Sequence, residues 1–319
     1  MELQKIQHGS IQKEMEILEL KLTEFLSSEV SLATKVASYL VKSGGKRIRP
    51  TLTILTGKAF GYKEKSLITL ACAIELLHTA SLIHDDVVDQ SDIRRGKTSI
   101  HRKWDNAHGV LVGDFVYSKA FQLMSSLENN KIITILADST NRISEGEILQ
   151  LTLKKKNKIK EKDYFDIIGR KTAELFKASV QSATLLAKAS QDQYQSMTNF
   201  AYSLGIVFQL NDDLLDYMGK ELQTGKKIGK DFEEGKLTLP LIKTLDLCTK
   251  KEASLIRSSL LSRKFENFKE IRCIIESSGA LNEIDKIIQK YSSSCLSELE
   301  KLPSSPYKES LKQIVRDLG

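Results

Sequence analysis

Apolar residues recur along most of this chain at the spacing of a helix rather than of a strand. Leu70, Ala73, Ile74 and Leu77 show the pattern, which places them on one face of a helix. Only four prolines occur, and none stands between positions 50 and 240. Because proline costs about 3 kcal/mol inside a helix, this composition favours uninterrupted helices. The sequence therefore predicts an all-α protein.

The same pattern divides the chain into helical stretches. One or two amphipathic helices are expected in residues 1–40, with an apolar set of Ile17, Leu18, Leu20, Leu22, Phe25 and Leu26. Further helices are expected at about 51–60, 65–90, 106–127, 130–154, 161–190, 193–219, 236–249, 252–262, 266–277, 280–299 and 304–317. With 319 residues the chain can bury a large core, and we expect a single domain over residues 1–319.

Two glycine-containing breaks interrupt this pattern. Ser43-Gly44-Gly45 ends one helical stretch, and a basic segment that reaches Pro50 follows it. The stretch 219–235 is the least regular part of the chain, with four glycines and four lysines. Its position suits a lid that binds phosphate.

Composition and charge exclude several classes of protein. Hydrophobic content of 41% with 28% charged residues is ordinary for a globular protein, and the net charge of +7 is spread along the chain, which disfavours nucleic acid as a partner. No stretch approaches the roughly 20 apolar residues of a membrane span, and the N-terminus resembles neither a signal nor a transit peptide. We expect a cytoplasmic protein with reduced thiols at Cys72, Cys248, Cys273 and Cys295.

Two aspartate clusters of the same form carry the first chemical signal. They are Asp85-Asp86-Val87-Val88-Asp89 and Asp212-Asp213-Leu214-Leu215-Asp216. On a helix, positions i and i+4 lie one above the other, so each cluster crowds its carboxylates on one face and needs a cation nearby. Oxygen ligands favour Mg²⁺, which completes its shell with water and phosphate oxygens. Two such clusters suggest two acidic walls that face each other across a diphosphate.

The alternative for a single cluster of this kind is a solvated helix face. Leu82, Ile83 and Val87 flank the first cluster, and Leu210 and Leu214 flank the second. Neither segment therefore has the composition of a charged, solvent-exposed helix face. The presence of two copies favours a metal site over that alternative.

Basic residues beside the glycine breaks and the acidic clusters are candidates for binding phosphate. Arginine offers paired donors to phosphate, and lysine offers a point charge. Any one of these basic residues, taken alone, is more readily explained as an ordinary surface side chain. Only its position beside a glycine break or an acidic cluster makes it a candidate for binding phosphate. The set consists of Lys46, Arg47, Arg49, Arg94, Arg95, Lys171, Lys226, Lys227, Lys230 and Lys236.

Several segments together resemble the trans-polyprenyl diphosphate synthases, in that family's order and roughly its spacing. They are SGGKRIRP, HTASLIHDDVVDQSDIRRG, GDF, EGEILQL, GRKTAELF and FQLNDDLLDYMG with GKKIGKDFEEGKLTLPL, and they cover about residues 40–245. The resemblance implies a large antiparallel helix bundle around a central elongation cavity. It also implies head-to-tail condensation of an allylic diphosphate with isopentenyl diphosphate through an allylic carbocation.

The resemblance also implies the metal ligands. The first cluster would hold two Mg²⁺ on the allylic diphosphate through Asp85, Asp86 and Asp89. The second cluster would hold the third ion through Asp212 and Asp216, with Asp213 supporting them.

Substrate contacts follow from the same resemblance. The allylic diphosphate would be neutralised by Arg94, Lys171, Lys226 and Lys236. Isopentenyl diphosphate would be bound by Lys46, Arg49, His78 and Arg95, although His78 also fits a hydrogen-bonded helix histidine. Thr172 and Gln209 would face the cation and the step of proton loss, for which no general base is obvious in the sequence; the released diphosphate is a candidate acceptor. Departures from the family pattern stand at Lys227, where proline is common, and at Lys230, where a small polar residue is common.

Product length is predicted from the helix that carries Asp85. Ala80 and Ser81 lie roughly 6–7.5 Å below the aspartates along the helix axis, where the prenyl tail must grow. An aromatic ring there would close the shaft, whereas alanine and serine leave it open, and Leu77 is only moderately bulky one turn deeper. We therefore expect a long product of about six to ten isoprene units, from farnesyl or geranylgeranyl diphosphate as primer.

Three alternatives remain: a short-chain farnesyl or geranylgeranyl diphosphate synthase, a non-catalytic subunit of a heteromeric synthase, and a terpene cyclase. A non-catalytic subunit would be expected to lose an acidic motif or its lysines, and both motifs are intact. A cyclase would carry a different second metal motif. The resemblance further implies a homodimer, with the helical segment after Asp105 as a candidate interface, and transient membrane contact for product release.

Overall fold

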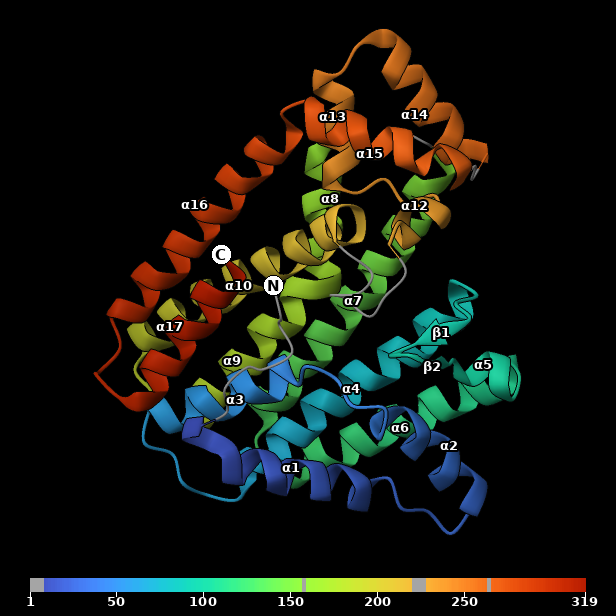
Figure 1. Ribbon diagram of the computed structural model, residues 1–319. Coiled ribbons are helices and arrows are strands. Elements are labelled where there is room, and N and C mark those ends of the chain that lie inside the picture. Colours follow the sequence, from blue (N-terminus) through green and yellow to red (C-terminus); the bar gives the residue numbers. More distant parts are fainter. Residues whose placement is uncertain (1–8, 157–158, 220–227, 263–264) are drawn as a thin grey trace.

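Long helices make up almost all of the fold, as the apolar spacing predicts (Figure 1). The computed structural model describes residues 9–156, 159–219, 228–262 and 265–319. The first half of the chain contains η1 (Gly9–Ile11), α1 (Gln12–Phe25), α2 (Ser31–Val41), α3 (Ile48–Ala59), α4 (Ser66–Val88), α5 (Ile100–Lys103), α6 (Asn106–Ser126) and α7 (Asn130–Lys156). The prediction of an all-α fold is confirmed.

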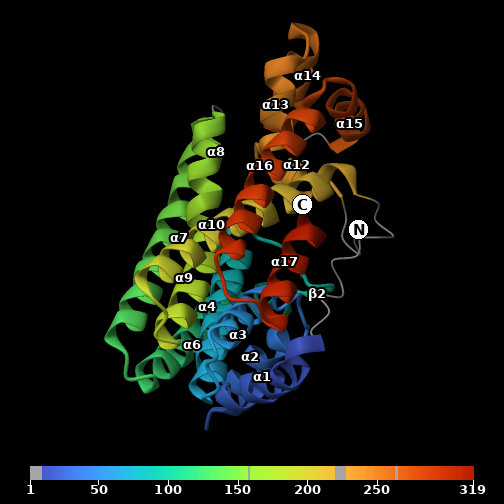
Figure 2. The same ribbon diagram turned by 90° about the vertical axis from the view of Figure 1, so that its left-hand side faces the viewer.

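The second half continues with helices of more varied length. They are α8 (Glu161–Ile168), η2 (Gly169–Ala173), α9 (Glu174–Leu186), α10 (Gln191–Met218), α12 (Lys230–Glu233), α13 (Leu239–Leu247), α14 (Lys250–Ser262), η3 (Phe265–Asn267), α15 (Phe268–Ser277), α16 (Ala280–Glu300) and α17 (Pro306–Leu318). Helices α13, α14 and α15 lie at the opposite end of the bundle from α1 and α2 (Figure 2).

Helix α4 forms the centre of the bundle. It packs against α1, α3, α6 and α9, and most of its side chains are buried. By length and composition alone this helix of 23 residues could cross a membrane, so the expectation that no stretch approaches this limit was wrong. However, 67% of the apolar stretch of α4 is buried inside the fold. A helix that is apolar on all sides also suits the core of a protein.

Two hydrophobic cores hold the helices together. The larger core joins α1–α4, α6, α9, α10, α16 and α17. The smaller one lies between the end of α10 and α12–α15, and its buried members include Tyr217, Phe232, Ile256 and Phe268. The expectation of a single domain over the whole chain stays a prediction.

The N-terminal helices show which part of the predicted apolar set faces the core. Leu18, Leu22 and Leu26 are fully buried, because a spacing of four residues keeps them on one stripe. Ile17 and Leu20 lie off that stripe and are 46% and 73% exposed, so only part of the apolar set faces the core.

Local structure departs from the prediction in other places as well. The single helix expected at 161–190 is divided into α8, the π-helical turn η2 and α9. A two-stranded hairpin, β1 (Ile93–Arg94) with β2 (Lys97–Thr98), follows the first aspartate cluster, where no element was predicted. Both features place basic side chains at the candidate site.

Candidate active site

The first aspartate cluster lies at the C-terminal end of α4. Acidic side chains there oppose the helix dipole, so they need compensation by cations. Arg94 of β1 supplies one cation, and its Nε and Nη2 donate to Asp86 Oδ1 at 2.8 and 2.5 Å. Burial raises the pKa of Asp85 to about 6, although the positive charge of Lys171 opposes this shift. Burial thus disfavours the charged form of Asp85, and a nearby cation would favour it.

The second cluster lies near the end of α10, where buried hydrogen bonds hold Asp213. The hydroxyl of Tyr164 donates to Asp213 Oδ2 at 2.6 Å, and Gln209 Nε2 donates to Oδ1 at 2.6 Å. Thr172 in turn donates to Gln209 Oε1 at 2.6 Å. Burial raises the pKa of Asp213 to about 7 and that of the neighbouring Asp231 well above its usual range.

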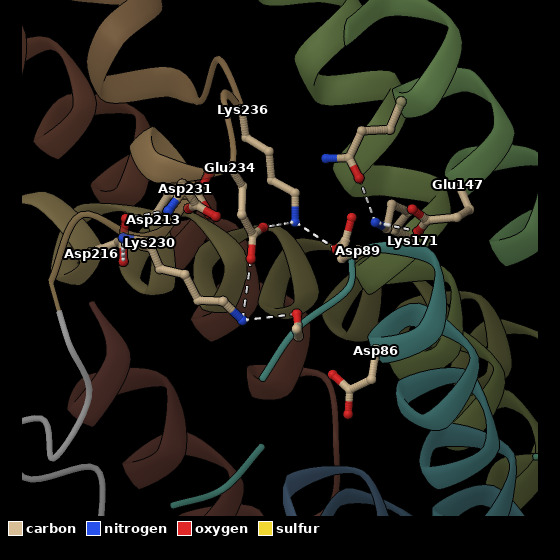
Figure 3. Close-up of polar contacts among 12 residues, drawn as sticks. Asp86, Asp89, Glu147, Lys171, Asp213, Asp216, Lys230, Asp231, Glu234 and Lys236 are labelled. Atoms are coloured by element: carbon tan, nitrogen blue, oxygen red, sulfur yellow. Dashed lines mark hydrogen bonds and ion pairs between the residues drawn. The ribbon is translucent and has the colours of Figure 1, made fainter. Parts of the chain in front are cut away.

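The loop formed by residues 228–238, which precedes α13, links the two clusters (Figure 3). On one side, the backbone N–H groups of Lys230 and Asp231 donate to the carboxylate of Asp216 at 3.1 and 2.9 Å. On the other side, Lys236 Nζ lies 2.9 Å from Asp89 Oδ2. Burial alone would lower the pKa of Lys236, but Asp89 and Glu234 outweigh it and raise that pKa. The loop therefore spans from one acidic wall to the other.

The π-helical turn η2 brings Lys171 and Thr172 to the site. A Cβ on Gly146 of α7 would come within 2.8 Å of Arg170, and one on Gly205 of α10 within 2.5 Å of Ala173. These two glycines therefore allow α7 and α10 to pack closely on both sides of the turn. Such turns often occur at functional sites.

Lys171 reaches from η2 toward α7. It donates to Gln150 Oε1 at 2.6 Å and pairs with Glu147. Both partners belong to the EGEILQL segment, so this segment positions the lysine near Asp85.

A group of basic side chains lies around the N-terminus of α3 and the middle of α4. Arg49 Nη1 is 3.1 Å from His78 Nε2, and the guanidinium stacks on the Phe176 ring at 4.8 Å. Burial and the charge of Arg49 lower the pKa of His78 well below its usual range, so a neutral His78 accepts this hydrogen bond. Burial also lowers the pKa of Arg49 to about 10. Lys46 Nζ lies 5.4 Å from the centre of the Phe208 ring, next to Gln209.

Glu75 is a buried carboxylate beneath this basic group. Arg47 Nη1 donates to Glu75 Oε1 at 2.6 Å, and Arg95 Nη2 lies 3.8 Å from the same oxygen. Arg47 also pairs with Glu19 of α1 and donates to the carbonyl of Val41. Arg95 donates to the carbonyl of Gly44. Glu75 thereby holds the two arginines that bind the carbonyl groups of Val41 and Gly44, at the glycine break.

The structure brings most of the sequence-predicted residues together around the ends of α4 and α10. Leu77 and Ala80 are buried on α4, and Ser81 donates to the carbonyl of His78 at 2.9 Å. Lys226 and Lys227 lie outside the described residues. Sequence reasoning missed several partners of the predicted residues, namely Glu19, Glu75, Glu147, Gln150, Tyr164, Asp231 and Glu234. Glu75 was detectable as a lone acid in an otherwise apolar stretch.

Comparison with known proteins decides the family. The model of the Polyprenyl synthetase family matches residues 30–277. The chain belongs to the polyprenyl synthetase family. It is 38% identical to the octaprenyl diphosphate synthase of Escherichia coli K12 over 98% of this chain and 96% of that protein.

Solved structures of the family agree with this assignment. The decaprenyl diphosphate synthase of Rhodobacter capsulatus superposes with a TM-score of 0.92 at 33% identity, covering 99% of this chain and 98% of that one. A Caulobacter crescentus polyprenyl synthase, solved with calcium and isoprenyl diphosphate, gives 0.94 at 33% identity, covering 99% and 97%. The predictions of a prenyltransferase enzyme and of the isoprenoid synthase fold are confirmed.

Polyprenyl synthetases depend on metal ions and use allylic and isopentenyl diphosphates. Among the described residues, no group of three or more Asp, Glu, His or Cys side chains is arranged so that it could hold a metal ion. The donors nevertheless fit a hard cation, because both clusters offer carboxylate oxygens.

Proposed function

We propose that this polyprenyl synthetase makes a long-chain all-trans polyprenyl diphosphate by adding successive isopentenyl diphosphates to an allylic diphosphate, farnesyl or geranylgeranyl diphosphate. The observation that carries this proposal is the lysine-bearing loop that spans the two aspartate clusters, with a separate basic group beside them. Two diphosphates require two such cationic environments. The names of the relatives described above support a long product.

In this proposal Asp85, Asp86 and Asp89 hold two Mg²⁺, and Asp212 and Asp216 hold a third. When bound, the ions would stabilise the developing charge of the diphosphate leaving group. Asp213 supports this wall through its hydrogen bonds to Tyr164 and Gln209. Positive charge around the same leaving group comes from the basic residues assigned to the allylic site, which are Arg94, Lys171, Lys226 and Lys236.

Lys46, Arg49, His78 and Arg95 bind isopentenyl diphosphate. Arg49 and His78 are held in place by their mutual hydrogen bond, and Arg95 is held by Glu75. Pre-positioned donors of this kind cost little reorganisation when the substrate binds.

In this proposal the hydrogen-bonded pair of Thr172 and Gln209 faces the allylic cation. After the new C–C bond forms, the product loses one proton, and the released diphosphate accepts it. The apolar core around the site excludes water, which would otherwise capture the cation.

The growing chain extends along α4 past Ser81, Ala80 and Leu77. Ala80 is buried and has a side chain of a single methyl group, which would obstruct a prenyl chain less than an aromatic ring would. This small residue supports a product of about six to ten units, because it would not block the growing chain one turn below the aspartates.

The enzyme acts as a homodimer in the cytoplasm and contacts a membrane transiently to release its product. Helix α6 supports the dimer proposal because Val110, Leu111 and Phe121 are exposed on it. Light scattering on the purified protein tests this state, and a monomer would contradict it.

The reaction is tested by incubating the purified protein with farnesyl diphosphate, labelled isopentenyl diphosphate and Mg²⁺. Incorporation of label into longer linear diphosphates is expected. Cyclic hydrocarbon would indicate a terpene cyclase, and failure to incorporate label would indicate a non-catalytic subunit.

A further inference from the structure

Glu234 is shared between two lysines of the loop that spans the aspartate clusters (Figure 3). Its Oε2 lies 2.6 Å from Lys236 Nζ, and its Oε1 lies 3.3 Å from Lys230 Nζ. Each lysine also reaches the segment at the end of α4, Lys236 at Asp89 and Lys230 at Ser91 Oγ. Glu234 therefore stands beside the cation that the proposed function assigns to the allylic diphosphate.

A carboxylate in this position competes with the substrate. Engagement of Asp89 by a metal ion would weaken its pairing with Lys236, and Glu234 would then remain as the anion held by that lysine. Both side chains are largely buried, so water screens their interaction only weakly. A diphosphate must displace this carboxylate from Lys236 and then tolerate its negative charge nearby.

Lys230 offers the displaced carboxylate another partner. Its backbone N–H binds Asp216, and the adjacent Gly229 N–H donates to the Asp216 carbonyl at 2.7 Å. These contacts do not involve the Lys230 side chain, so a substitution there leaves the loop anchored. Lys230 is also a position at which the sequence departs from the family pattern.

We propose that the carboxylate of Glu234 stays paired with Lys236 until the allylic diphosphate binds to that lysine. The side chain of Lys230 then neutralises the displaced Glu234. Lys230 is therefore a positioning residue for this substrate. The inference rests on the proposed function for the role of Lys236. A purely structural role for Lys230 would affect both substrates alike. The proposed role predicts a change in KM for the allylic substrate alone, and this change requires Glu234.

The test is a double-mutant cycle with Lys230→Ser, Glu234→Gln and the double variant, and with Lys230→Arg to retain the charge. KM for farnesyl diphosphate, KM for isopentenyl diphosphate and kcat are measured with Mg²⁺. Binding of inorganic diphosphate with Mg²⁺ is measured by calorimetry on the same proteins. Lys251→Ser on the exposed surface of α14 is the matched control, and thermal unfolding checks the fold of every variant.

Lys230→Ser is expected to raise KM for farnesyl diphosphate and the Kd of inorganic diphosphate by roughly threefold to tenfold, in the range of coupling between charged neighbours. KM for isopentenyl diphosphate and kcat should stay within about twofold. Lys230→Arg should retain the parent values, and Lys230→Ser should have no further effect when Glu234 is already glutamine.

An unchanged KM in Lys230→Ser overturns the inference. So does an equal rise in the Glu234→Gln background, since the lysine would then act without the carboxylate. If the parent protein performs no condensation, the proposed function fails instead, and the calorimetric cycle still decides whether Lys230 and Glu234 act together on a diphosphate.

Discussion

Lys236 and Asp89 stand 147 positions apart in the sequence and form an ion pair of 2.9 Å. This contact joins the loop that follows the second aspartate cluster to the end of the helix that carries the first. It converts two separate acidic motifs into one site. The loop could perform this role only because its other end is fixed to Asp216 by backbone N–H groups.

Removal of a carboxylate from the first cluster should abolish turnover without unfolding the protein. We expect Asp85→Ala to lose at least a thousandfold in kcat/KM, because a missing ligand removes several kcal/mol of charge stabilisation from the transition state. Steady-state rates at saturating Mg²⁺ measure this, with Asp246→Ala on the exposed end of α13 as the control. Retention of activity within about tenfold of the parent would refute the metal assignment.

The two groups of basic residues should separate in their kinetic effects. Lys46→Ala and Arg95→Ala should mainly raise KM for isopentenyl diphosphate, because both lie with the group around Arg49 and His78. Arg94→Ala should act on the allylic substrate, because Arg94 pairs with Asp86. Varying one substrate at saturation of the other measures each KM. The reverse pattern would overturn this division of the site.

Glu75 should matter for stability far more than Glu19, the other carboxylate that pairs with Arg47. Glu75→Gln leaves Arg47 and Arg95 without their buried carboxylate, and loss of one partner in such a pair costs about 3–5 kcal/mol of unfolding free energy. Glu19 is 49% exposed, so Glu19→Gln should cost only about 1 kcal/mol or less. Urea unfolding of both variants gives the comparison. Equal losses would show that burial of Glu75 does not control this network.

The sequence predicted the parts of the site that depend on local spacing. The aspartates of both clusters were identified because their spacing and their apolar flanks are visible in the chain. Lys171 and Thr172 were identified because the segment GRKTAELF resembles the family. The break at residues 43–45 was likewise visible, since glycine pairs interrupt helices. These features need no knowledge of which helices touch.

The features that the sequence did not predict depend on tertiary contacts. Tyr164 donates to Asp213 across 49 positions, and no local pattern relates the two residues. The π-helical turn η2 has the same apolar spacing as the α-helices on either side, so the pattern merged them into one helix. The turn is instead distinguished by tertiary contacts, since Gly146 and Gly205 pack closely against it.

Product length is the most specific part of the proposed function, and Ala80 is the residue on which it depends. Ala80→Phe places a ring in the interior beside α4 and should stop elongation at about three or four units, because the helix rise puts it one turn below the aspartates. Ser81→Phe should stop it at a similar or earlier point. Some loss of stability is expected from the added volume, about 1–3 kcal/mol, so thermal unfolding accompanies the assay.

The most direct test of the account is the length of the product that the parent enzyme and Ala80→Phe release. Farnesyl diphosphate, labelled isopentenyl diphosphate and Mg²⁺ are supplied, and the dephosphorylated products are separated by thin-layer chromatography. We expect the parent to give a long product of about six to ten units and Ala80→Phe to give short products while remaining active, because the ring would block the shaft without touching a phosphate ligand. A parent that makes only farnesyl or geranylgeranyl diphosphate, or a long product that Ala80→Phe leaves unchanged, would contradict the open shaft along α4.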